Sequence, residues 1–117
     1  VEEIKSSALT ISYDDLMRHN ENRVGKILYH RGNVVQVAEM WGNSYVLRVA
    51  TKKQPYIGYF GDEVWVNYKG ERLLEGDIID VWGKIKGLKT YRAVLGNEIT
   101  IPEVNSLHVE LVRKAGG

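Results

Sequence analysis

Apolar and polar residues alternate through most of this chain, and glycine or asparagine interrupts the alternation at short intervals. Because successive side chains of a β-strand point to opposite faces, each alternating segment predicts a strand with one buried face. The segments lie at residues 26–37, 45–51, 63–68, 77–85 and 107–112. Strands at this spacing, with turn residues between them, predict a small sandwich or barrel.

Glycines within these strands favour the barrel. The alternation in residues 26–37 slips around Gly32, which predicts a bulge or a sharp bend. Gly83 lies inside another of the predicted strands. A small barrel needs glycines or bulges at the points where its sheet coils back on itself.

The alternation also assigns faces to individual side chains. Val46, Trp65 and Trp82 point outward, and Trp82 is interpreted as packing under an N-terminal helix with Tyr13 and Leu16. For Trp65 two interpretations stay open, an exposed ring or a ring covered by the loop that includes residues 56–60. The residues of the last strand that are predicted to face inward are Leu107, Val109 and Leu111.

One helix is predicted before the first strand, over residues 13–22. Ser12 is placed to cap it, and Asp14 and Asp15 follow in the first turn, where the helix dipole favours negative charge. One apolar stripe runs along it, formed by Tyr13, Leu16 and Met17. We expect this helix to cover the open end of the barrel.

A hairpin is predicted at residues 91–101, with its turn at Gly96 and Asn97 and its end at Pro102. It lengthens the connection between the fourth and fifth strands of the barrel.

The ends of the chain are predicted to lie outside the barrel domain, which spans residues 11–113. Residues 1–10 are polar and lack the apolar segment of a signal peptide, so they are interpreted as a flexible tether or linker remnant. Residues 114–117 are interpreted as a frayed tail.

The composition is that of a single globular domain. The chain has 117 residues, of which 44% are hydrophobic and 26% are charged. Cysteine is absent, which excludes disulfides, thiolate catalysis and zinc–thiolate sites. No apolar run approaches the roughly 20 residues of a membrane-spanning helix.

Charge is unevenly distributed along the chain. The net charge is only +1, but residues 81–97 carry Lys84, Lys86, Lys89 and Arg92 without any acidic residue. The segment is therefore either a local site for an anion or a solvated hairpin whose lysines protect a sheet edge from pairing.

Three segments resemble the OB-fold, a five-stranded barrel. They are GKILYHRGNVVQV (25–37), Leu47-Arg48-Val49 and EGDIIDVWG (75–83). More narrowly, a short helix before a strand that opens with Gly25-Lys26 resembles the tRNA anticodon-binding-like (tRNA_anti-like) group of bacterial OB-fold proteins. The resemblance covers residues 11–112. It implies an all-β fold with one N-terminal helix, a five-stranded OB-fold-like barrel with an extra β-hairpin between the fourth and fifth strands. Residues 69–76 depart from the pattern, since they are too short for the helix that many OB domains carry there.

The residues favour a protein that is not an enzyme. The chain has no nucleophile elbow, P-loop, dinucleotide-binding fingerprint or HExxH motif. Asp77 and Asp80 point to opposite faces of one strand and cannot pair. His19, His30 and His108 lie on separate elements without the spacing of metal ligands, and are interpreted as surface or boundary residues. We therefore expect no catalytic residue, no metal and no cofactor.

Binding residues are better supported. OB domains commonly bind ligands on the outer face of their second and third strands, between two flanking loops. Carried over to this chain, that face presents Arg48 and Trp65. The adjoining loops and strands supply Trp41, Lys84, Lys86, Lys89, Tyr91, Arg92, Lys52, Lys53, Tyr56 and Tyr59. Aromatic rings interleaved with cations suit single-stranded DNA or RNA, because bases stack on the rings and cations follow the phosphates.

Two functions stay open at this point. The first is a binding module for single-stranded nucleic acid, which the basic segment favours. The second is an extracytoplasmic module, secreted or membrane-tethered as in a lipoprotein, that binds a protein or a glycan; the low net charge favours it. A signal peptide or anchor before Val1 would place the domain outside the cytoplasm, and its absence would leave the domain in the cytoplasm. The oligomeric state is not fixed by the sequence.

Overall fold

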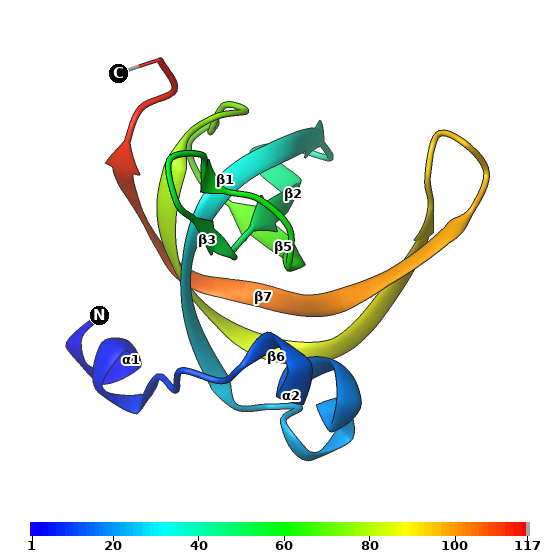
Figure 1. Ribbon diagram of the computed structural model, residues 1–117. Coiled ribbons are helices and arrows are strands. Elements are labelled where there is room, and N and C mark those ends of the chain that lie inside the picture. Colours follow the sequence, from blue (N-terminus) through cyan, green and yellow to red (C-terminus); the bar gives the residue numbers. More distant parts are fainter. Residues whose placement is uncertain (117) are drawn as a thin grey trace.

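The computed structural model describes residues 1–116 and shows a closed five-stranded barrel preceded by short helices (Figure 1). The helical elements are α1 (Glu2–Ser7), α2 (Tyr13–Arg18) and the 3-10 turn η1 (Asn20–Asn22). The barrel strands are β1 (Ile27–Glu39), β2 (Ser44–Ala50), β5 (Glu63–Lys69), β6 (Ile78–Arg92) and β7 (Glu98–Arg113). A separate small hairpin consists of β3 (Lys53–Gln54) and β4 (Gly58–Tyr59).

The strands follow one another around the barrel in the order β1–β2–β5–β7–β6. Neighbouring strands are antiparallel, apart from the parallel pair of β5 and β7, which joins residues 65–67 to residues 103–105. The fold is an all-β, OB-fold-like barrel with N-terminal helical elements, as the sequence predicted.

The core confirms most of the predicted inward positions. Val64 and Val66 are fully buried, and Trp65 lies outward between them. Leu107 and Leu111 were wrongly predicted as buried, since 43% and 44% of their surfaces are exposed. The pairing of β6 and β7 shifts register at Leu107, which becomes the extra residue of a bulge, and shifts again just beyond Leu111.

The predicted cap of the N-terminal helix is present, since the Ser12 hydroxyl accepts a hydrogen bond of 3.1 Å from the backbone N–H of Asp15. The helix ends earlier than predicted, at Arg18, and η1 follows it. Leu16 is buried in the core, and the Tyr13 hydroxyl donates a hydrogen bond of 2.7 Å to the carbonyl of Glu63. Figure 1 shows α2 at the lower end of the barrel, where it acts as the expected cover. None of the helices in residues 1–116 is long and apolar enough to cross a membrane.

The fourth strand and the predicted hairpin form one continuous structure. β6 and β7 pair from the barrel out to Arg92 and Glu98, so the hairpin projects well beyond the barrel (Figure 1). The prediction that Pro102 ends the hairpin was wrong, because β7 continues through this residue. Pro102 precedes the residues at which β7 gains β5 as its second neighbour, so its missing N–H interrupts no pairing with β5.

The N-terminal segment differs from the predicted flexible tether. Residues 2–7 form α1, and Leu9 continues as a β-bridge beside Leu28 of β1. At the other end, the Ala115 N–H donates a hydrogen bond of 2.8 Å to a carboxylate oxygen of Asp77, which holds part of the predicted frayed tail. Residue 117 of that predicted tail lies outside the described residues.

Candidate functional site

A groove of about 600 Å³ lies where the β6–β7 hairpin curves over the outer face of the barrel. Its floor comes from β1, β2 and β5, and its wall comes from the hairpin and its turn. The residues that line it are Gln36, Ala38, Val46, Arg48, Trp65, Tyr91, Arg92, Ala93, Val94, Leu95, Asn97 and Ile99. The floor includes the outer face of the second and third barrel strands, where the resemblance places ligands.

Two aromatic rings form the centre of this groove. The ring centroids of Trp65 and Tyr91 lie 5.6 Å apart with an angle of 42° between the planes. The Lys89 ammonium lies 5.2 Å from the centroid of the Trp65 ring. Tyr91 and Lys89 of β6 therefore cover part of Trp65. The interpretation in which the loop at residues 56–60 covers this ring is wrong.

Arg48 holds this aromatic pair in place. One of its terminal nitrogens donates to the Tyr91 hydroxyl at 2.9 Å and to the Glu63 carboxylate at 2.7 Å. Its Nε donates to the side-chain oxygen of Gln36 at 2.6 Å, and its guanidinium lies 5.1 Å from the centroid of the Tyr91 ring. Because Glu63 balances its charge, Arg48 acts mainly as a support for Tyr91.

The other predicted cations of the basic segment differ in their availability. Lys86 lies 3.7 Å from the buried carboxylate of Glu103, and Arg92 donates to the Gly96 carbonyl at 2.7 Å inside the hairpin turn. Lys84 is exposed, and neither Lys84 nor Lys89 is among the lining residues, but the Lys89 ammonium lies over the ring of Trp65, which is one of them. Lys89 forms no ion pair within residues 1–116, so it is the cation of this set that is best placed to meet an anion beside Trp65.

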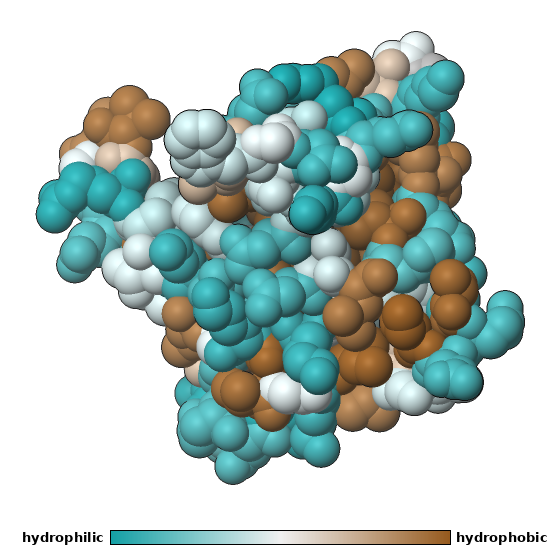
Figure 2. Space-filling model, turned by 180° about the vertical axis from the view of Figure 1, so that it is seen from behind, coloured by the Kyte–Doolittle hydropathy of each residue, from teal (hydrophilic) through white to brown (hydrophobic). Residues whose placement is uncertain are grey.

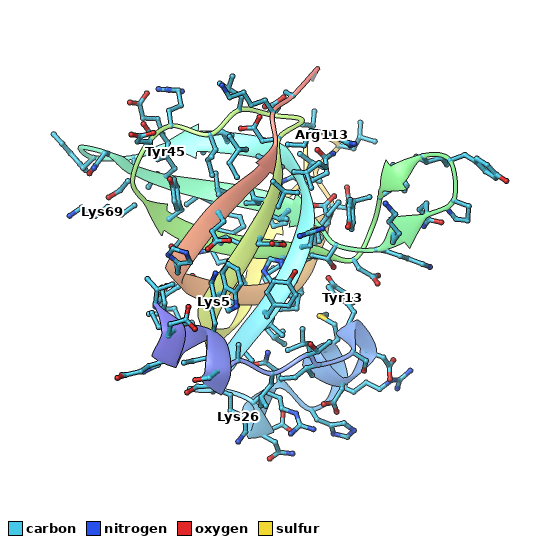
Figure 3. The ribbon with its side chains drawn as sticks, turned by 90° about the vertical axis from the view of Figure 1, so that its left-hand side faces the viewer. Lys5, Tyr13, Lys26, Tyr45, Lys69 and Arg113 are labelled. Carbon is cyan, nitrogen blue, oxygen red and sulfur yellow. The ribbon has the colours of Figure 1, made fainter. Side chains whose placement is uncertain are left out.

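A second group of predicted residues does not reach the groove. Trp41 lies in the turn between β1 and β2 with 93% of its surface exposed. The others, Lys52, Lys53, Tyr56 and Tyr59, lie in or beside the β3–β4 hairpin, where the Lys53 ammonium is 4.9 Å from the centroid of the Tyr59 ring. This hairpin projects from the barrel wall, at the right of the view in Figure 3. The structure therefore places these residues at separate surfaces.

Sequence reasoning did not assign several apolar residues of the groove to a binding site. Val46 was predicted to point outward, which is correct, and it lines the groove floor. Val94 and Leu95 form the hairpin tip with 103% and 94% of their surfaces exposed. In Figure 2 hydrophobic atoms mark this tip, on the projecting lobe at the left of the view. The signal that could have identified this tip as part of a binding site was the pair of apolar residues before the Gly96-Asn97 turn.

The acidic residues on β6 and just before it have structural partners. Asp77 accepts hydrogen bonds of 2.8 Å from the backbone N–H groups of Leu74 and Ala115. Asp80 accepts two hydrogen bonds from Arg31, which is the main reason that the pKa of Asp80 lies below its ordinary value. Within residues 1–116, no three His, Asp or Glu side chains gather in a way that could hold a metal ion.

Comparison with known proteins supports the fold. No protein-family model matches the chain, and no curated protein is similar to it in sequence. A solved structure with a similar fold is that of a protein assigned as an aspartyl-tRNA synthetase from Leishmania major Friedlin, with a TM-score of 0.56 and 12% sequence identity. The match covers 97% of this chain and 25% of the other one, so this chain corresponds to about a quarter of that protein.

Proposed function

We propose that this chain is a non-enzymatic OB-fold module that binds single-stranded nucleic acid in the groove beneath the β6–β7 hairpin. The observation that carries the proposal is the grouping of Trp65, Tyr91 and Lys89 on the outer face of the barrel. A ring pair supplies a surface on which a base can stack, and an ammonium beside it meets the adjacent phosphate.

Trp65, Lys89 and Arg48 have distinct parts in this proposal. A base stacks on the open part of Trp65, and the Lys89 ammonium contacts the phosphate that follows. Arg48 is a positioning residue, because its hydrogen bond holds the Tyr91 hydroxyl and its charge is already balanced by Glu63. The similar structure carries the name of a tRNA synthetase, which makes single-stranded RNA the first ligand to test.

The proposal predicts that Trp65→Ala weakens binding of a fluorescein-labelled mixed-sequence RNA 12-mer about ten- to a hundredfold, the loss of one stacked base. Lys89→Ala should reduce the slope of log affinity against log salt by about 0.7, as expected for one phosphate contact. Fluorescence anisotropy at two salt concentrations measures both effects.

Trp41→Ala and Lys53→Ala are the matched controls, because these residues have the same chemistry but lie outside the groove. They should leave the affinity within about twofold, less than the effect of one stacked base. Equal losses in all four variants would show that binding is not localised to the groove. No binding by the unaltered chain at low salt would reject the nucleic-acid proposal.

A protein ligand is the second candidate, and the exposed apolar tip of the hairpin favours it. Val94 and Leu95 border the groove, and apolar residues of this kind beside aromatic rings are typical of protein interfaces. Leu95→Ser separates the two candidates. If rings and phosphate contacts carry binding, this variant keeps its affinity for RNA within about twofold. If the ligand is instead a protein that contacts the hairpin tip, this variant should no longer bind it.

A further inference from the structure

A second aromatic surface lies on a different part of the barrel, across β1, β6 and β7. Tyr29, Trp82 and His108 occupy paired positions on these neighbouring strands. The centroid of the Trp82 ring lies 5.1 Å from that of Tyr29 and 5.4 Å from that of His108. The three side chains therefore form a continuous row of rings, with Trp82 in the middle.

Two carboxylates border this row. Asp80 accepts a hydrogen bond of 2.8 Å from the Tyr29 hydroxyl, and Glu110 lies 2.8 Å from the Nε2 atom of His108. Arg31 binds Asp80 and fixes its orientation. Glu110 remains 43% exposed at its side chain, so one edge of the surface carries an accessible negative charge. Ring faces and a carboxylate together favour a cationic ligand.

A cation already occupies the surface. The Lys5 ammonium of α1 lies 4.7 Å from the centroid of the Trp82 ring and 2.6 Å from a carboxylate oxygen of Glu110. Figure 3 shows Lys5 between α1 and the barrel wall. Trp82, which faces outward, is only 7% exposed. The sequence-based interpretation that Tyr13 and Leu16 cover it is therefore incorrect, because those residues belong to α2 at the end of the barrel.

The element that carries Lys5 is weakly held. α1 has six residues, none of them buried, and none belongs to the core cluster. Helices this short are not stable in isolation, so α1 depends on its few contacts with the barrel. Lys5 supplies both an ion pair and a cation–π contact, whereas the core does not depend on α1.

We propose that this row of rings, together with Glu110, is a second binding site of the domain. Its ligand is the lysine side chain of a segment of a partner protein. Within the chain, Lys5 occupies the site until such a segment displaces α1. A compact ammonium fits the observed contacts, one to a ring face and one to a single carboxylate oxygen. Asp80 is already paired with Arg31, and the remaining negative charge of Glu110 disfavours an anionic ligand.

The test uses the full chain with Lys5→Ala, which removes the resident ammonium and weakens the hold on α1 without altering the core. The probe is an acetylated and amidated peptide with the sequence EEIKSSA, residues 2–8 of this chain. The control peptide carries glutamine in place of lysine. Titration is followed by the NMR signal of the Trp82 indole N–H, assigned by its loss in Trp82→Phe.

The lysine peptide should bind the Lys5→Ala chain at least about tenfold more tightly than the unaltered chain, because Lys5 no longer competes at its high effective concentration. The glutamine peptide should bind at least about tenfold more weakly than the lysine peptide, and Glu110→Gln in the Lys5→Ala background should cause a similar loss. Equal binding of both peptides would overturn the proposal. So would equal binding by both chains, or no shift of the Trp82 signal at millimolar peptide.

Discussion

Replacing Gly32 by alanine should destabilise the protein by roughly 3 kcal/mol or more, at the upper end of the cost of overpacking a close-packed interior. An added Cβ would lie 2.2 Å from the Ala50 carbonyl oxygen and 2.7 Å from a methyl group of Val49. Both atoms belong to β2, the neighbour of β1, and a backbone oxygen cannot rotate away as a side chain can. The two strands would have to separate where β1 passes from its pairing with β6 to its pairing with β2, next to Asn33.

Urea unfolding followed by tryptophan fluorescence measures this effect, with Gly42→Ala as the control. Gly42 also lies beside β1, in the turn before β2, but nothing lies within 4 Å of an added Cβ there. Its φ of 63° should make alanine cost only about 1 kcal/mol. If both substitutions cost the same, the contact with Ala50 does not limit the approach of the two strands.

The barrel could be predicted because it depends on local patterns. Alternation identified the inner and outer positions of β2 and β5 correctly, including Val64, Trp65 and Val66. It failed on β7, where a bulge moves Leu107 out of the expected position. A bulge depends on how two separate strands pair with each other, so the pattern of one strand alone does not show it.

The candidate groove could be predicted only in part. Arg48 and Trp65 followed from strand alternation together with the OB-fold resemblance. The contact of Arg48 with Tyr91 joins residues 43 positions apart and depends on the curvature of a long hairpin. For the same reason, nothing in the sequence showed that Glu63 would balance the charge of Arg48.

The N-terminal segment shows a second limit of sequence reasoning. Residues 1–10 are polar, and polar segments of this kind are usually mobile. Lys5 nevertheless reaches Glu110, which lies 105 positions away. That contact requires the finished barrel, since Trp82 and Glu110 come together only when β6 and β7 have paired.

His30 should make the protein sensitive to acid, which is the second large effect that we expect. The sequence suggested a surface or boundary residue, and His30 is only partly buried as a whole, but it lies on the same face of β1 as the buried residues Leu28 and Val34. Both of its ring nitrogens are buried, and neither has a hydrogen-bond partner within residues 1–116. Burial lowers the pKa of His30 from 6.5 to about 4, and the negative charge of Asp80 opposes this only in part.

The direction of the pH effect follows from proton uptake. Between pH 6.5 and about pH 4, the unfolded chain binds a proton at His30 and the folded chain does not. The free energy of unfolding should therefore fall as the pH decreases through this range, by roughly 2–3 kcal/mol at pH 4.5 relative to pH 7. Asp80 affects the free energy of unfolding only at lower pH. Its pKa is shifted below 3.8, so its stabilising contribution is lost under more acidic conditions than that of His30.

His30→Leu distinguishes this cause from general acid effects. At pH 7 the variant should be at least as stable as the unaltered chain, because it removes two buried nitrogens without partners. Its free energy of unfolding should also change much less between pH 7 and pH 4.5 than that of the unaltered chain. His19→Gln is the control, since His19 is exposed and its replacement should leave the difference unchanged. Urea unfolding at the two pH values measures both variants. If His30→Leu keeps the full pH dependence, the acid sensitivity arises elsewhere, and the ion pairs of the surface carboxylates become its source.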